Sequence, residues 1–171
     1  MKKERIDFVK KAIIHTERAI AAAELLIKNE LFDFAYNILW IALENLGTIE
    51  NPKRGKDKNH ANKSENALWD LYNLKSAISL FLNDKQNKKK TKEFSKAFNR
   101  IFGKKMLDYD RFIKLVKKRH SAIYLNDEKP SWEIFKKEET IQLLVILKFY
   151  LRYFRGGIKA GASFENLLHL F

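Results

Sequence analysis

The chain has 171 residues, of which 46% are hydrophobic and 32% charged, a composition that predicts one globular domain over residues 1–171 and excludes a disordered protein. It contains no cysteine, which excludes disulfides, thiolate nucleophiles and cysteine-based metal sites and fits a cytoplasmic location. The N-terminus lacks the apolar run of a signal peptide, and the longest apolar stretch, IQLLVILKFYL, is too short to span a bilayer, so no membrane association is expected.

Positive charge is concentrated in the middle of the chain. The formal net charge is +13, and residues 51–119 hold 20 Lys/Arg against 7 Asp/Glu, whereas the segments on either side are close to neutral. A field of one sign in one region attracts polyanions such as RNA. The alternative, a general lysine bias, would spread the lysines evenly. Only 8 of the 34 basic residues are arginine, so we expect contacts to phosphates with little sequence preference.

Two amphipathic helices are predicted at the start of the chain. The first runs from an N-cap at Asp7 to a stop at Asn29, and its expected inner face is Phe8, Ala12, His15, Ala19, Ala22 and Leu26. The second runs from about Leu31 to Glu50, and its expected inner face is Phe34, Ala35, Ile38, Leu39, Ala42, Leu43, Leu46 and Ile49. A link of only one or two residues predicts an antiparallel hairpin.

The remaining elements are also predicted to be helices. After the polar loop NPKRGKDKNHANK, a helix capped by Ser64 is expected, followed by the short amphipathic helix TKEFSKAFNRIF. A fifth helix starts near Asp108, and the longest one, KKEETIQLLVILKFYLRYF, is expected to be central and to stop at Gly156 and Gly157. A short last helix follows Ser163. Strand-like alternation is missing, so the fold class is all-α, a bundle of five to seven helices.

The hairpin sequence AAAELLIKNELFDFAYNILWIALENLGTIE resembles the first two helices of HEPN domains, small helical bundles found in RNases, toxins and phage-defence proteins. ALENLGTIE is similar to a segment of the abortive-infection AbiV-like branch. NHANK, which holds His60 and Lys63, resembles the His-x-x-Lys of that branch, and RHSAIYLND resembles its segment of basic residues followed by Tyr-x-Asp.

This resemblance implies a homodimer in which Arg-x(4–6)-His motifs meet in a basic cleft and cut RNA without a metal. Arg119 matches the arginine of the motif, but Tyr124 stands where the histidine is expected. A tyrosine with its ordinary pKa of about 10 is a poor base at neutral pH. His120 or His60 is therefore the candidate acid–base group. Three interpretations stay open: a basic helix end with a packed tyrosine, a polyanion-binding cleft, and a working nuclease site.

Other polar residues have structural explanations. His15 lies on an apolar stripe, which favours a buried, hydrogen-bonded position in the core, and no two histidines have metal-ligand spacing, so neither a metal nor another cofactor is expected. Glu138 and Glu139 open a helix, where negative charge is favourable.

The sequence therefore predicts a HEPN-like protein that binds RNA, with possible cleavage, in phage defence or a toxin–antitoxin system. The phosphate-binding residues would be Arg54, Lys63, Lys117, Lys118 and Arg119. The alternative is a non-catalytic module whose basic surface binds an acidic protein, such as an antitoxin or a phage factor.

Overall fold

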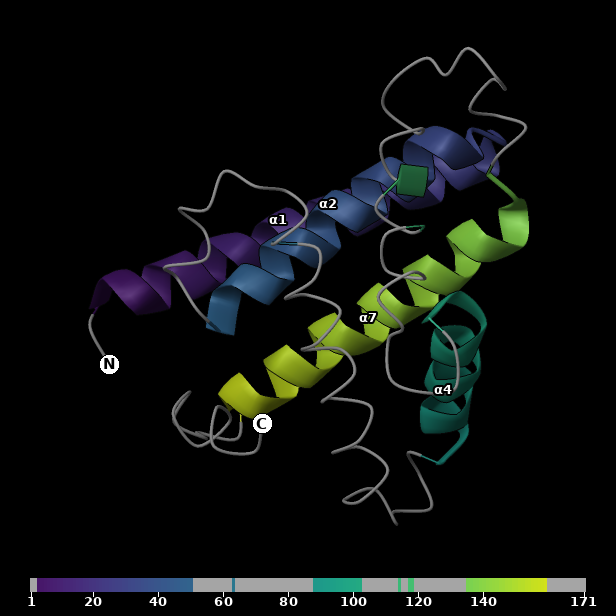
Figure 1. Ribbon diagram of the computed structural model, residues 1–171. Coiled ribbons are helices and arrows are strands. Elements are labelled where there is room, and N and C mark those ends of the chain that lie inside the picture. Colours follow the sequence, from purple (N-terminus) through teal and green to yellow (C-terminus); the bar gives the residue numbers. More distant parts are fainter. Residues whose placement is uncertain are drawn as a thin grey trace.

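The computed structural model describes residues 3–50, 88–102 and 135–159, together with Lys63, Lys114, Lys117 and Lys118. Its helices are α1 (Lys3–Lys28), α2 (Phe32–Glu50), α4 (Lys88–Phe102) and α7 (Lys137–Lys159), and the four single residues are also helical (Figure 1). No strand occurs among the described residues, which confirms the all-α class. None of the helices in these ranges is long and apolar enough to cross a membrane.

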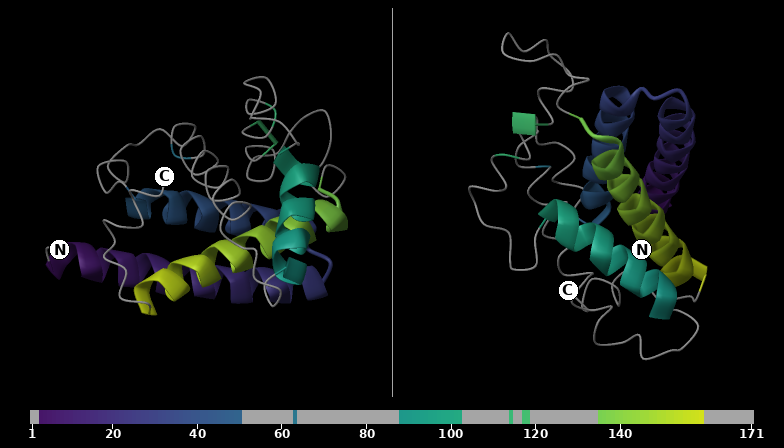
Figure 2. Two further views of the ribbon diagram at one scale, coloured as in Figure 1. Left: turned by 90° about the horizontal axis from the view of Figure 1, so that it is seen from below. Right: turned by 90° about the vertical axis from the view of Figure 1, so that its right-hand side faces the viewer.

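The N-terminal hairpin is confirmed. α1 and α2 lie side by side over most of their length and are joined by three residues, Asn29 to Leu31 (Figures 1 and 2). Asn29 ends α1 as predicted, because its side-chain amide donates to the carbonyl of Leu25 at 2.8 Å. The amides of Glu30 and Leu31 donate to the carbonyls of Ile27 (3.1 Å) and Leu26 (2.9 Å), the crossed pair of bonds that closes a helix with one left-handed residue.

That left-handed residue is Glu30, whose φ is 61°. A left-handed conformation costs a residue with a Cβ roughly 1 kcal/mol and costs glycine nothing. We expect Glu30→Gly to raise the free energy of unfolding by about 0.5–1 kcal/mol, measured by urea denaturation. The matched control is Ala22→Gly at an exposed position inside α1, which should lower it by about 1 kcal/mol. A loss of stability in Glu30→Gly would contradict this account of the turn.

The buried face of α1 differs from the predicted one. Ala12 and Ala19 are buried as predicted. The other side chains of α1 that reach the core each lie one residue beyond a predicted position: Val9, Ile13, Thr16, Ile20 and Ala23. His15 is exposed, so its predicted burial is wrong, and its Nδ1 lies 3.3 Å from the side-chain amide of Asn45 on α2. The predicted cap at Asp7 is also wrong, because α1 begins at Lys3.

α2 supplies the centre of the core. Leu39, Leu43 and Leu46 are fully buried as predicted, while Phe34 is 56% exposed and was wrongly placed inside. Trp40 and Tyr36 are the two largest fully buried side chains among the described residues. Both lie one residue away from predicted inner positions, because α2 is covered on two sides, by α1 and by α7.

α7 packs against α1, α2 and α4, which confirms its predicted central place (Figure 2). It continues to Lys159, so the predicted stop at Gly156 and Gly157 is wrong. Glycine weakens a helix by about 1 kcal/mol but does not break its hydrogen bonds, so it ends a helix only where the chain turns left-handed. α4 lies across α7 and buries Phe94, Ala97, Phe98 and Ile101, all but the alanine being predicted inner positions.

Candidate nucleic-acid interface

The basic segment before Arg119 is attached to the start of α7. Lys118 is half-buried, forms an ion pair with Glu139, and its Nζ lies 5.4 Å from the ring centre of Phe135. Both contacts hold the ammonium group in place, one through the charge of the carboxylate and one through the negative face of the ring. Lys118 is therefore an anchor of the segment, whereas its neighbour Lys117 is exposed.

The ring of Phe135, over which Lys118 lies, belongs to a cluster of aromatic side chains. The centre of the Tyr36 ring lies 4.8 Å from the centre of the Phe135 ring and 6.0 Å from the centre of the Trp40 ring. Burial raises the pKa of the Tyr36 hydroxyl well above its ordinary value, and the negative charge of Glu139 adds to the effect. Tyr36 thus stays protonated at any physiological pH and cannot act as a base there.

The raised pKa of Tyr36 predicts a loss of stability at high pH. The pKa of Tyr36 is higher in the folded chain than in the unfolded one. Its contribution to the free energy of unfolding is therefore complete below about pH 10, where tyrosine titrates in the unfolded chain, and falls as the pH rises further. We expect this group to add up to about 1.4 kcal/mol of lost stability per pH unit. Urea denaturation at pH 7 to 11 should give a shallower decline in Tyr36→Phe than in the wild type. Parallel profiles would contradict the assignment.

The structure describes three of the eight site residues that were predicted from the sequence. These are Lys63, which is half-buried, and Lys117 and Lys118. The other five, Arg54, His60, Arg119, His120 and Tyr124, lie outside the described residues. Among the described residues, no group of three or more His, Cys, Asp or Glu side chains converges as metal ligands do.

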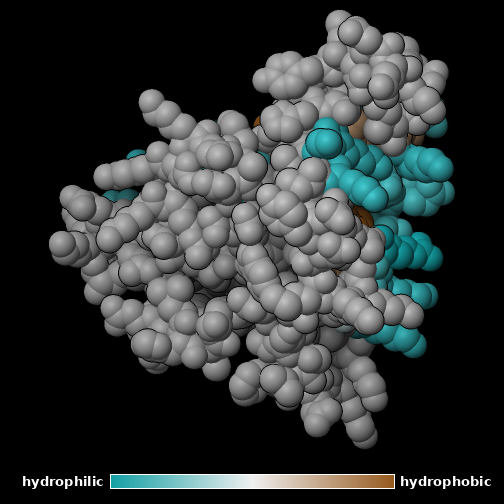
Figure 3. All heavy atoms as spheres, in the orientation of Figure 1, coloured by the Kyte–Doolittle hydropathy of each residue, from teal (hydrophilic) through white to brown (hydrophobic). Residues whose placement is uncertain are grey.

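α4 presents the clearest basic surface of the described structure. Its 15 residues contain six Lys/Arg and one carboxylate, Glu93. Lys92, Lys96 and Arg100 are exposed and follow one another at four-residue steps, so they form a row along the helix with about 6 Å between successive positions. The opposite face is the buried apolar one, which fixes this row outward. Figure 3 shows the hydrophilic side chains gathered along the edge of the molecule where α4 lies.

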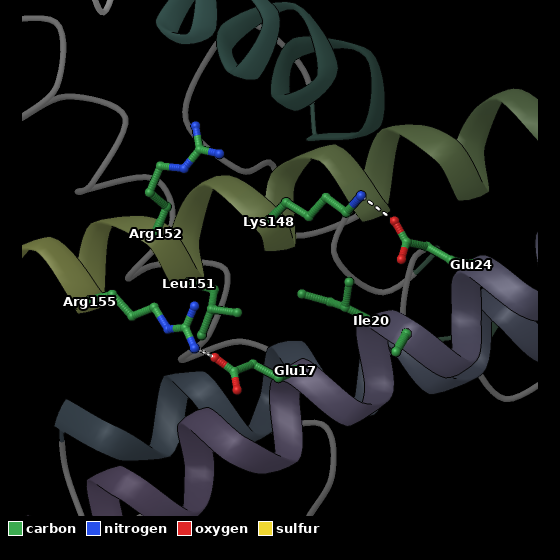
Figure 4. A pocket seen from close by; sticks show the side chains of 8 residues that line it. Glu17, Ile20, Glu24, Lys148, Leu151, Arg152 and Arg155 are labelled. Atoms are coloured by element: carbon green, nitrogen blue, oxygen red, sulfur yellow. Dashed lines mark hydrogen bonds and ion pairs between the residues drawn. The ribbon is translucent and has the colours of Figure 1, made fainter.

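A second group of cations stands on α7, where it crosses α1. Lys148 forms an ion pair with Glu24 and Arg155 forms one with Glu17, two rungs that join α7 to α1 (Figure 4). Each rung is half exposed to solvent, so it contributes about 1 kcal/mol at most. Between the rungs lies a hollow of about 420 Å³ with Ile20 and Leu151 among its apolar lining residues.

Arg152 lies between Lys148 and Arg155 in the sequence but belongs to neither ion pair. Its side chain points away from α1, and no ion pair links it to a carboxylate of the described residues (Figure 4). It lines the hollow against α1 and also a smaller one of about 170 Å³ against α4, and Lys148 is shared in the same way. Of the five charged side chains among the described residues that line the larger hollow, four form the two ion pairs, and the fifth is Arg152, whose guanidinium points away from α1.

Lys148, Arg152 and Arg155 were missed in the sequence because they belong to the nearly neutral C-terminal segment. Their spacing of four and three residues on a helix was a usable signal, since it places them on one face. No protein-family model, curated protein or solved structure shows a significant match to this chain.

Proposed function

We propose that this protein binds single-stranded RNA through a basic surface that includes the outer row of α4 and the segment at Lys117 and Lys118. The observation that carries the proposal is the division of α4 into a buried aromatic face and an exposed row of Lys92, Lys96 and Arg100. A folded helix held by its apolar face presents these charges without further ordering, which favours capture of a polyanion. Lysine dominates this surface, so contacts to phosphates with little sequence preference are expected.

Salt dependence tests the proposal directly. If about six phosphates are neutralised, the affinity for a fluorescein-labelled oligouridine should fall on the order of a few hundred-fold between 50 and 200 mM salt. The double variant Lys92→Gln/Lys96→Gln should bind more weakly, and the slope of log K against log salt should be shallower by about 1.4. Fluorescence anisotropy measures both quantities.

The matched control removes the same charge elsewhere. Lys10 and Lys11 are also exposed, but they lie on α1, far along the chain from the basic segment. Lys10→Gln/Lys11→Gln should leave the salt slope close to that of the wild type. Equal effects of the two double variants would show that net charge, and not the α4 surface, determines binding. No binding at low salt, or binding that salt does not change, would end the proposal.

Cleavage is a separate step of the proposal and rests on the HEPN resemblance, which also implies a homodimer and a role in phage defence or a toxin–antitoxin system. Arg119 would hold a phosphate, and Tyr124 occupies the position of the histidine in the motif. We therefore expect weak or absent RNase activity in the wild type and a gain in Tyr124→His, because histidine titrates near neutral pH.

The measurement is cleavage of a labelled single-stranded RNA in the presence of EDTA, which removes metal nucleases. Arg119→Ala in the Tyr124→His background should abolish the gain. It should change stability by no more than about 0.5 kcal/mol if Arg119 is a surface residue. Strong wild-type cleavage that survives both Arg119→Ala and His120→Ala would place the chemistry elsewhere, and binding without any cleavage in Tyr124→His would leave a non-catalytic RNA-binding protein.

A further inference from the structure

An aromatic side chain and two cations line the hollow where α4 crosses α7. The hollow has a volume of about 170 Å³ and is lined by Glu93, Val145, Lys148, Phe149 and Arg152. Phe149 is only half-buried, in contrast to Phe94 of α4, which is fully buried. The core therefore leaves part of Phe149 accessible in a hollow that two cations and one carboxylate also line.

The ring of Phe149 is held in a fixed orientation. It stacks on the ring of Phe94 with the two centres 4.5 Å apart and the planes inclined by 22°. Phe94 also contacts Phe98, the next aromatic side chain of the buried face of α4. A ring fixed in this way is a ready platform for another flat group, because little side-chain entropy is lost when that group binds.

The charges around the ring differ in their availability. Lys148 is paired with Glu24 of α1, whereas Arg152 is exposed and has no carboxylate partner among the described residues. Glu93 opposes a phosphate placed inside the hollow and can accept hydrogen bonds from the N–H groups of a base. The arrangement thus favours an uncharged flat group inside and a phosphate outside, at Arg152.

We propose that this hollow is a base-binding subsite, in which a nucleobase stacks on Phe149 while Arg152 holds the adjacent phosphate. This inference rests on the proposed RNA binding and narrows it, because the ligand is then a nucleic acid strand and not any polyanion. The hollow adjoins the basic row, since Glu93 follows Lys92 directly on α4. Stacking on an aromatic side chain and a flanking cation is how single strands are bound without sequence preference.

The test compares strands that differ only in their bases. Wild-type protein is titrated at fixed salt with an oligouridine, with an abasic strand of the same phosphate number, and with inorganic polyphosphate of similar charge. One stacked base is worth about 1–3 kcal/mol, so the oligouridine should bind about 5- to 150-fold more tightly than the abasic strand. This comparison needs no variant and so does not depend on any change of fold.

Variants then locate the effect. Phe149→Leu keeps an apolar side chain and should weaken oligouridine binding by a similar factor while polyphosphate binding stays unchanged, and Phe149→Tyr, which keeps the ring, should retain wild-type binding. Arg152→Gln should weaken both ligands. Urea denaturation confirms that each variant is folded.

The outcomes distinguish failure of the base-binding subsite from failure of the proposed RNA-binding surface. If the oligouridine, the abasic strand and polyphosphate bind equally well, the base-binding subsite is wrong and the RNA-binding surface stands. If the oligouridine binds more tightly than the abasic strand but Phe149→Leu does not change oligouridine binding, the bases are bound elsewhere and the proposed subsite is again wrong. If no strand binds at low salt, both the subsite and the proposed function fail.

Discussion

Burial of α7 against three other helices is the constraint on which the described structure depends. A helix covered by α1, α2 and α4 must be apolar around most of its circumference, and Leu143, Ile146, Leu147 and Tyr150 are accordingly almost completely buried. Only a narrow strip is left for charged side chains, and it lies beside the helices that cover α7. Lys148, Arg152 and Arg155 occupy that strip. As a direct result of the packing, all three line the larger hollow, and Lys148 and Arg152 also line the smaller one.

The same constraint explains why the apolar and the basic residues of α4 lie on opposite faces of the helix. It meets the rest of the core through Phe94 and Phe98 on one side, and nothing in the described structure requires the other side to be apolar. The aromatic rings stabilise the contact with α7, and one large buried aromatic contributes about 3 kcal/mol or more when measured by truncation to alanine. The exposed lysines then cost little, because they remain in water. Structural and functional demands are thus separated onto opposite faces of one helix.

The buried face of a helix covered on one side could be predicted from the sequence, whereas the buried faces of helices covered on two or more sides could be predicted only in part. Phe94, Phe98 and Ile101 of α4 were predicted correctly to face inward because they and Phe102, whose side chain lies outside the described ones, are the only large apolar residues in a run of lysines. On α1, Val9, Ile13 and Ile20 lie next to Ala12 and Ala19, so two adjacent stripes are both apolar, and the pattern does not decide between them. His15 was misplaced for this reason, since a shift of one residue rotates a helix by about 100°.

The candidate site shows a similar division. Local sequence indicated that the middle of the chain is basic and that Lys117 and Lys118 belong to a helix, as they do. It did not indicate that Lys118 meets Glu139, because the two residues are 21 positions apart and only the packing of α7 brings them together. The rungs between α1 and α7 join residues more than 120 positions apart, and such pairs depend on the tertiary fold. Charge composition therefore predicted the kind of surface but not the residues that are held in place.

Lys148 belongs to two environments at once, with Glu24 on the α1 side and the hollow against α4 on the other. A phosphate that is held at Arg152 and also reaches Lys148 would compete with Glu24 for the same ammonium group, so that binding of the phosphate and formation of the Lys148–Glu24 ion pair would be thermodynamically coupled. Such coupling is reciprocal: whatever weakens the Glu24 pair strengthens the anion site, and a bound anion loosens α7 from α1 at that point by the same free energy. The carboxylates of α1 are in this sense internal competitors of any anionic ligand of the α7 cations, and the strength of their ion pairs sets the affinity that such a ligand has to exceed.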